Sequence, residues 1–243
     1  MSSVLLDVQG LSRRFGGLKA VDGLSLQIRP REIVGLLGPN GSGKTTALNL
    51  ISGVLAPDSG SVKIDGHEFA GSPAYRITHH GVGRTFQLVR LFNTMTVREN
   101  VVAGMAFTNG RLFGREAAKQ AESLLERVGL AGYAGKEAGR LTYMDQKKVE
   151  LARALAGRPK VLLLDEWLAG LNPTELIDAI ALVRSLKDDD ISILMVEHVL
   201  EAVRSLCDHC VVMTAGVPIS YGTPAQVLSN PEVIRAYLGD EHA

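Results

Sequence analysis

The residues from Gly38 to Thr45 have the types and spacing that bind phosphate. They read Gly-Pro-Asn-Gly-Ser-Gly-Lys-Thr, and an apolar run at 33–37 precedes them while a helical pattern follows. Glycines let successive backbone N–H groups turn toward phosphate oxygens, and the positive end of the following helix faces the same ligand. We therefore predict a nucleotide phosphate site in which Lys44 reaches the β- and γ-phosphates and the Thr45 hydroxyl ligates Mg²⁺.

An acidic pair follows a second apolar run. The run 161–164 ends directly on Asp165 and Glu166. Asp165 is expected to hold Mg²⁺ through the water shell of the metal, because Mg²⁺ dehydrates reluctantly. Glu166 is placed to orient or deprotonate an attacking water. Such a pair at a strand end, downstream of a phosphate loop, indicates an ATP hydrolase and argues against a small-molecule kinase.

Four short apolar runs predict the strands that position these groups, at 33–37, 161–164, 191–196 and 210–213. Continuously apolar strands separated by helical stretches predict a parallel sheet that is covered on both faces. Ligands bind beyond the carboxyl ends of such strands. The polar residues that end these runs should therefore converge on one edge.

The N-terminal part follows a different pattern. Residues 1–30 and 60–70 alternate between polar and apolar types, with turn residues at 58–60 and 65–66. This alternation predicts a small antiparallel sheet.

From about residue 88 to 155 the chain has no convincing strand pattern, which predicts an all-helical insertion. Thr96 precedes Glu99 by three residues and predicts a helix N-cap, as does Asn172 at the start of a later helix. The stretch 116–128 is amphipathic and is followed by a glycine that should end its helix.

Composition limits the function classes. The 243 residues carry 26 Lys+Arg and 26 Asp+Glu, and 46% are apolar, so the chain can bury a core and is not disordered. Zero net charge argues against a nucleic-acid binder that works through bulk basicity. We expect neither a secretory signal nor a membrane-spanning helix, and two cysteines fit a reducing compartment.

Further segments carry the pattern of one family. They are Phe-Gly-Gly-Leu-Lys-Ala-Val (15–21), Gly-Val-Gly-Arg-Thr-Phe-Gln (81–87), Arg-Leu-Phe (90–92), Thr-Val-Arg-Glu-Asn (96–100), Ala-Gly-Leu-Asn-Pro (169–173), Glu-His (197–198) and Ala-Tyr-Leu-Gly (236–239). With the phosphate loop, they make the chain resemble the ATP-binding subunits of ABC transporters over nearly its whole length. Within that family it resembles the ATPases of branched-chain amino-acid importers.

The resemblance implies an α/β fold, a P-loop NTPase core with a mainly parallel sheet, an N-terminal antiparallel β subdomain and an inserted α-helical subdomain. The chain would then be a single ABC ATPase domain, 1–243. Residues 1–87 would form the core with its β subdomain, 88–155 the helical signature subdomain, and 156–243 the rest of the core, with the Walker B carboxylates and a switch histidine.

The resemblance also implies a role for each matching residue. Phe15 stacks on adenine, Gln87 touches Mg²⁺ and senses a membrane partner, and His198 contacts the γ-phosphate. The residues implied in catalysis are Glu166, His198, Gln87 and Lys44. Those implied in holding Mg²⁺ are Thr45, Gln87 and Asp165. Those implied in binding ATP are Phe15, Gly38, Pro39, Asn40, Gly41, Ser42, Gly43, Lys44, Thr45, Thr46 and Thr142.

Such subunits bind ATP and Mg²⁺ and power the import of branched-chain or other hydrophobic amino acids. The resemblance implies two transmembrane permease subunits, and a second ATPase, itself or a sibling, in a head-to-tail dimer. It also implies an indirect link to a periplasmic substrate-binding protein, and a peripheral location at the cytoplasmic face of the inner membrane. The surface around Gln87 to Asn100 is the expected attachment site. The alternatives are the ATPase of a lipid-export ABC system and a soluble ABC ATPase that does not act in transport.

The family's signature segment is altered in this chain. Thr142 stands for the usual serine, Met144 for a glycine whose backbone N–H meets the γ-phosphate, and Asp145 for a glutamine. A carboxylate that close to a triphosphate is repulsive by at least about 1 kcal/mol. Alternatively, Thr142 and Asp145 form a helix capping box, with the carboxylate folded back onto its own backbone. Both interpretations stay open, and with an intact sibling the first predicts one complete and one weakened nucleotide site.

Three other features have structural interpretations. Trp167 replaces the family's usual proline and is expected to pack beneath the site. Cys207 and Cys210 offer too few ligands for a metal, so one should close a helix and the other open a strand. No aromatic platform accompanies the basic residues, so they predict solvated or partner-facing charges and no nucleic-acid partner. These residues are Arg84, Arg90, Arg98, Lys147 and Lys148.

Overall fold

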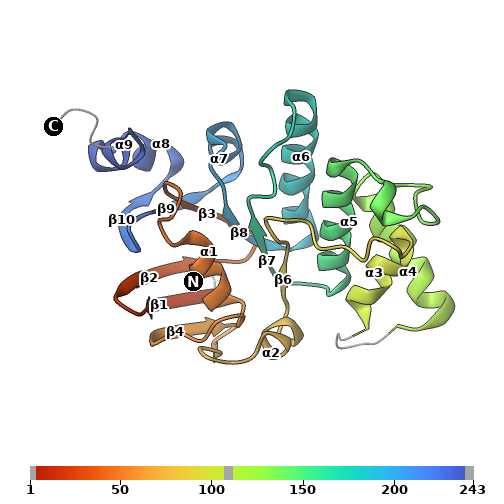
Figure 1. Ribbon diagram of the computed structural model, residues 1–243, viewed down its shortest axis with the longest axis horizontal. Helices are drawn as coiled ribbons and strands as arrows, with labels where there is room; N and C mark the ends of the chain where they lie inside the picture. The colour runs from red at the N-terminus through yellow and green to blue at the C-terminus, as the bar shows by residue number, and fades with distance from the viewer. Residues whose placement is uncertain (1–3, 107–111, 239–243) are drawn as a thin grey trace.

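The computed structural model describes residues 4–106 and 112–238, and two β-sheets organise them (Figure 1). The first sheet is antiparallel, in the order β2-β1-β4-β5. Its strands are β1 (Leu6–Phe15), β2 (Leu18–Ile28), β4 (Ser59–Ile64) and β5 (His67–Glu68). The second sheet has the order β10-β9-β3-β8-β7-β6 and is parallel except for β10. Its strands are β3 (Ile33–Leu37), β6 (Val82–Arg84), β7 (Val161–Asp165), β8 (Ser192–Val196), β9 (His209–Thr214) and β10 (Val217–Gly222).

The predicted sheets are confirmed. The four apolar runs are β3, β7, β8 and β9, each to within one residue at either end. The turn at Asp65 and Gly66 connects β4 to β5 with positive φ at both residues, which suits a tight hairpin. The other predicted turn is wrong by a residue or two, since β4 already begins at Ser59.

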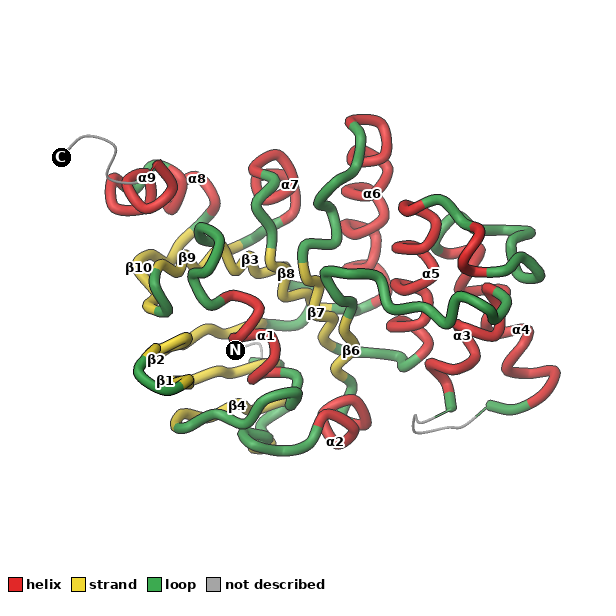
Figure 2. Tube along the Cα trace, in the orientation of Figure 1, coloured by secondary structure: helices red, strands yellow, loops and turns green. Residues whose placement is uncertain are grey.

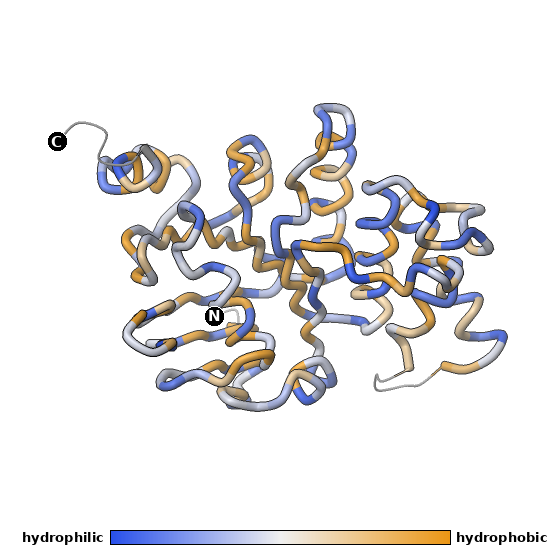
Figure 3. Tube along the Cα trace, in the orientation of Figure 1, coloured by the Kyte–Doolittle hydropathy of each residue, from blue (hydrophilic) through white to orange (hydrophobic). Residues whose placement is uncertain are grey.

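Side chains of the central strands alternate between two hydrophobic cores. In β3, Ile33 and Leu37 belong to one core, while Val34 and Leu36 belong to the other. Successive side chains of a strand point to opposite faces, so a strand that is apolar throughout must be covered on both sides. Figure 3 shows these apolar strands as a mostly orange band through the middle of the molecule.

Helices cover the two faces of the parallel sheet. The phosphate loop leads into α1, which packs with the antiparallel sheet on one face, and α6 and α7 lie on the other (Figure 2). The helices outside the insertion are α1 (Lys44–Ile51), α2 (Ala74–His79), α6 (Pro173–Ser185), η2 (Leu186–Asp189), α7 (Leu200–Leu206), α8 (Pro224–Leu228) and α9 (Pro231–Leu238). Among the described residues, no helix is long and apolar enough to cross a membrane.

The predicted helical insertion forms a cluster beside the β6 edge of the parallel sheet (Figure 1). Its helices are α3 (Val97–Met105), α4 (Gly114–Arg127), η1 (Ala138–Arg140) and α5 (Tyr143–Ala156). Thr96 and Asn172 are N-caps with complete capping boxes, as their spacing predicts. The subdomain borders at residues 87 and 155 stay a prediction.

Candidate nucleotide-binding and hydrolysis site

Close backbone contacts hold the phosphate loop in shape. Gly38 and Gly43 have φ of 144° and 100°. A Cβ on Gly38 would lie 2.1 Å from the carbonyl oxygen of Met213, and one on Gly43 would lie 2.1 Å from that of Ala20. At each of these two positions only glycine fits. Gly43 caps α1 without a side chain, so the first N–H groups of that helix stay directed at the loop.

Lys44 begins α1 and lies inside the loop. Its side chain is buried, and Nζ donates to the carbonyl oxygens of Gly38 and Pro39 at 2.8 Å each. Burial lowers the pKa of Lys44, and the carboxylates of Glu166 and Asp165 oppose that shift. The ammonium thus lies among the backbone groups that would surround a phosphate.

Asp165 ends β7, and its two carboxylate oxygens differ in their surroundings. Oδ2 accepts a hydrogen bond from Arg84 Nη2 at 3.0 Å, whereas Oδ1 is buried with no partner in the described part of the chain. Burial raises the pKa of Asp165, and the Arg84 guanidinium opposes that shift. A buried, unpaired carboxylate oxygen beside a phosphate loop suits the water shell of Mg²⁺.

Glu166 has a left-handed backbone, with φ of 49°. Its N–H donates to the carbonyl oxygen of Val196 at 2.9 Å, and its Oε2 accepts from Gln87 Nε2 at 2.7 Å. Such a backbone costs about 1 kcal/mol or more in a residue other than glycine, and strain of this kind gathers at functional sites. The first bond holds the Glu166 backbone against β8, and the second holds its carboxylate.

A pocket of about 510 Å³ brings most of the predicted residues together. Predicted site residues on its wall are Phe15, Asn40, Gly41, Gly43, Lys44, Thr45, Thr46, Gln87 and Glu166. Phe15 is 45% exposed, an open aromatic face with the guanidinium of Arg13 5.2 Å from its ring centroid. Four other predicted residues are not on this wall and support the phosphate loop or the strand end behind it. They are Gly38, Pro39, Ser42 and Asp165.

Two further predicted site residues, from neither the phosphate loop nor the end of β7, are also absent from the pocket wall. His198 is exposed and is the second residue after β8, and Thr142 is the N-cap of α5. The Oγ1 atom of Thr142 accepts from the N–H of Asp145 at 3.2 Å. Within the described residues the return bond from the Asp145 side chain is not found, unlike the complete boxes of α3 and α6. The capping interpretation therefore holds for its first half only.

Lys147 and Trp167 join the signature helix α5 to the segment after Glu166. Lys147 Nζ donates to the carbonyl oxygens of Trp167 at 2.8 Å and Ala169 at 2.9 Å, and Trp167 Nε1 donates back to the Lys147 carbonyl at 3.2 Å. Trp167 is buried, as predicted. The prediction of solvated charges is wrong for Lys147, which is 2% exposed, and for Arg84, whose side chain is 8% exposed.

Glu197 is another buried ionisable residue of this region. Its Oε1 accepts from the N–H of Leu168 at 2.7 Å, and Oε2 has no partner among the described residues. Burial raises the pKa of Glu197 to about 7. Glu197 thus connects the end of β8, which it follows, to the segment after Glu166, and it directly precedes His198.

Comparisons with known proteins agree with this geometry. The sequence pattern of the family described as "ABC transporter" matches residues 21–169. This chain belongs to the ABC transporter ATP-binding family. Residues 217–243 also match the pattern described as "Branched-chain amino acid ATP-binding cassette transporter". The chain is thus an ABC ATPase, an enzyme that binds and hydrolyses ATP.

Two curated relatives span the whole ABC ATPase. The high-affinity branched-chain amino acid transport ATP-binding protein BraF of Pseudomonas aeruginosa is 42% identical, over 99% of this chain and 100% of its own. The protein LivG of Escherichia coli, with the same description, is 41% identical over the same shares. A solved ATP-binding cassette of an ABC transporter in its ADP conformation is 31% identical, covers 98% of this chain and 100% of its own, and has a TM-score of 0.90.

Sequence reasoning missed four residues that shape the site of this ABC ATPase. Arg84, Lys147 and Glu197 are buried and charged, and Tyr237 of α9 accepts a hydrogen bond from the Gly38 N–H at 2.8 Å. Arg84, Glu197 and Tyr237 lie inside segments that carry the family resemblance. For Arg84 and Glu197 the available signal was a charged residue at the end of an apolar strand. The contact from α9 had no local signal, because 199 positions separate its two residues.

Proposed function

We propose that this ABC ATPase is the motor subunit of an importer for branched-chain or other hydrophobic amino acids. The main support is the Glu166 carboxylate, which lines the same pocket as Lys44 and is held there by Gln87. The relatives BraF and LivG, described as branched-chain amino acid transport ATP-binding proteins, support the choice of substrate.

The residues present fit Mg²⁺. Thr45, Gln87 and Asp165 would hold the ion, and the unpaired Asp165 Oδ1 is the feature that favours it. When bound, Mg²⁺ neutralises charge on the phosphates and on the leaving oxygen. The loop amides and Lys44 hold the β- and γ-phosphates. Glu166 orients a water and takes its proton as the water oxygen attacks the γ-phosphorus and the bond to the β-phosphate oxygen breaks, while His198 contacts the γ-phosphate.

We propose a head-to-tail dimer with a second ATPase, which is either a copy of this chain or a sibling. Thr142 lies outside the chain's own pocket, as expected of a residue that serves the nucleotide of the partner. A solved cassette that is 25% identical, with a TM-score of 0.81, is described as a dimer in a post-hydrolysis state with ADP and phosphate.

We propose that two permease subunits bind the surface around Gln87 to Asn100, with a periplasmic binding protein acting through them and no nucleic acid. Phe92 is 54% exposed there and lines a groove of about 410 Å³. An exposed aromatic beside a hollow is typical of a protein contact. The chain would then lie peripherally at the cytoplasmic face of the inner membrane.

Purification of the chain from mildly solubilised native membranes tests this proposal. We expect mass spectrometry to find two polytopic subunits and a second ATPase. Leu91→Ala and Phe92→Ala should reduce that recovery and leave ATP binding unchanged. Val217→Ala, at an exposed position of β10, is the control. Recovery of the chain alone or with soluble assemblies contradicts the importer.

A lipid-export system is the second candidate. The lipopolysaccharide export system ATP-binding protein LptB of Haemophilus influenzae is 32% identical over 98% of each chain. Recovery with lipid-export permeases in the same purification would favour it.

A further inference from the structure

Arg84 lies between a surface groove and the predicted magnesium site. It is the last residue of β6, beside β7, and its Nη2 donates to Asp165 Oδ2 at 3.0 Å. Its Nη1 donates to Asn49 Oδ1 at 2.8 Å and to Ser52 Oγ at 2.7 Å. Asn49 belongs to α1, the helix that begins in the phosphate loop, and Ser52 follows that helix. Three partners, one at the end of β7, one in α1 and one just after α1, therefore fix the plane of the guanidinium.

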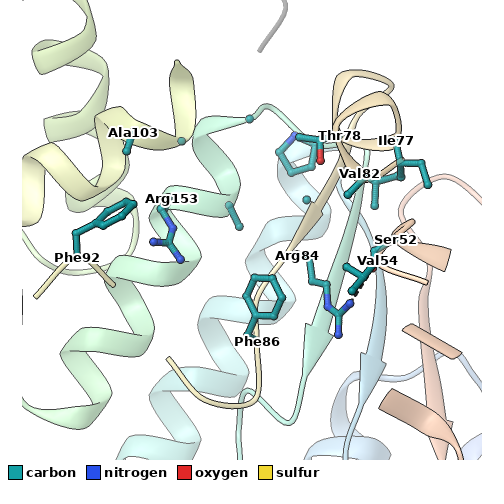
Figure 4. Close-up of a pocket in the computed structure, with 16 residues that line it drawn as sticks. Ser52, Val54, Ile77, Thr78, Val82, Arg84, Phe86, Phe92, Ala103 and Arg153 are labelled. Atoms are coloured by element: carbon teal, nitrogen blue, oxygen red, sulfur yellow. Dashed lines mark hydrogen bonds between the residues drawn. The ribbon is translucent and has the colours of Figure 1, made fainter. Parts of the chain in front are cut away.

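The groove is the hollow of about 410 Å³ that Phe92 also lines. Figure 4 shows Arg84 and Phe86 on one wall, with Phe92 and Arg153 across from them. The ring of Phe86 lies against Arg84, with the guanidinium carbon 5.0 Å from the ring centroid. Arg84 thus contacts a groove side chain at one face and the Walker B carboxylate at its tip.

The ion pair with Arg84 gives the two Asp165 oxygens different roles. Arg84 occupies Oδ2, which leaves Oδ1 as the buried oxygen without a partner in the described residues. A planar guanidinium with several fixed donors holds a carboxylate in one orientation, which a lysine ammonium does not. Without Arg84 the carboxylate would be free to rotate, and Oδ1 would lose its fixed direction.

We propose that Arg84 is a positioning residue that orients Asp165 toward Mg²⁺ and connects that carboxylate to the groove through Phe86. The inference rests on the proposed role of Asp165 in holding Mg²⁺. Arg84 itself is not on the wall of the nucleotide pocket. Its loss should therefore weaken the contribution of Mg²⁺ to nucleotide binding and leave metal-free binding unchanged.

Calorimetry on the isolated full chain measures this directly, as the ratio of ADP affinity with Mg²⁺ to ADP affinity in EDTA. We expect Arg84→Met to lower the ratio tenfold or more, with EDTA affinity within twofold of the original. Arg84→Lys should restore part of the ratio. The control is Arg153→Met, which removes another arginine from the same groove, one that pairs with Glu150 at 3.6 Å. Arg153→Met should keep the original ratio.

A second variant keeps the test decisive if Arg84→Met fails to fold. Phe86→Leu keeps an apolar side chain but removes the ring against which Arg84 lies, so we expect a two- to fivefold lower ratio. The fluorescence of Trp167, the only tryptophan and the residue after Glu166, should respond to Mg²⁺ less in both variants. The inference is overturned if Arg84→Met keeps the affinity ratio of the original chain. It is equally overturned if Phe86→Leu and Arg84→Lys both keep that ratio. If the unaltered chain shows no gain from Mg²⁺, the proposed metal role itself is wrong.

Discussion

The phosphate loop and the N-terminus of α5 differ in how closely they keep the family pattern. Every fixed position of the loop is filled, and its backbone contacts at Gly38 and Gly43 exclude any side chain. At the start of α5, Met144 fills a glycine position with a buried side chain, and Asp145 follows it. The first region is complete within one chain, whereas the second is expected to serve a nucleotide held by another chain.

This difference shows which contacts the fold itself requires. Replacing glycine by methionine in a helix raises helix propensity by up to about 1 kcal/mol, and burial of the Met144 side chain adds to stability. Asp145 lies in the first turn of α5, where a negative charge interacts favourably with the helix dipole. The altered signature therefore stabilises α5 of this chain, and the repulsion interpretation predicts a cost at the proposed contact with the second ATPase.

Glu166→Gln is the sharpest test of the complete region. The amide cannot accept the proton of the attacking water, so we expect phosphate release to fall by about 10²-fold or more. ATP binding should stay within twofold, since the loop and Lys44 are untouched. Glu201→Gln, on an exposed position of α7, is the control. An equal loss in both variants, or a loss of ATP binding, would contradict the role of Glu166.

Gly43→Ala tests how tightly the loop is built. Gly41 and Gly43 both have positive φ, but a Cβ at 43 would lie 2.1 Å from the Ala20 carbonyl oxygen, while nothing lies within 4 Å of one at 41. We expect Gly43→Ala to lower the free energy of unfolding by about 3 kcal/mol, and Gly41→Ala by about 1 kcal/mol. Chemical denaturation of both variants measures the difference. Equal losses would mean that strain alone, and not the contact with Ala20, sets the cost.

Much of the fold could be predicted because its signals are local. The central strands are short runs of apolar residues, and their ends place the phosphate loop and Asp165 on one edge. The capping boxes at Thr96 and Asn172 depend on residues three positions apart. Such patterns need no knowledge of distant parts of the chain.

The supporting contacts of the site could not be predicted in the same way. Arg84 contacts Asp165 across 81 positions, and Lys147 contacts Trp167 across 20. A charged residue in isolation is most often exposed, so composition and pattern favoured solvated side chains at both places. Burial by the packing of α5 and β6 against β7 overrides that tendency.

Glu197 gives a prediction that depends on pH. Its pKa is raised from 4.5 to about 7 in the folded protein, so the folded state holds this proton more tightly than the unfolded state does. The ionised Glu197 carboxylate therefore destabilises the folded state. This destabilisation is absent below about pH 4.5, grows as the pH rises, and is constant above about pH 7. Glu197→Gln removes it and keeps an acceptor for the Leu168 N–H.

We therefore expect the stability of Glu197→Gln, relative to the original chain, to improve by about 2 kcal/mol between pH 5 and pH 8. Chemical denaturation at the two pH values measures this difference. Comparing the two pH values cancels the cost of burying the new amide N–H, because that cost is the same at pH 5 and at pH 8. Glu201→Gln should show no such change. A pH-independent difference for Glu197→Gln would mean that Lys147 keeps the carboxylate ionised in the folded state.

Restoring the signature tests the other region. In the reconstituted complex, Met144→Gly with Asp145→Gln should raise ATP turnover about fivefold, because a repulsion of at least about 1 kcal/mol is removed and a phosphate can approach the backbone N–H at position 144 without a side chain beside it. Asp145→Gln alone separates the charge from the backbone effect. The isolated double variant should lose about 2 kcal/mol of stability through the lost Met144 side chain. Unchanged turnover at saturating ATP, with that stability loss present, would mean that this signature no longer limits hydrolysis, and that Met144 and Asp145 act through the stability of α5.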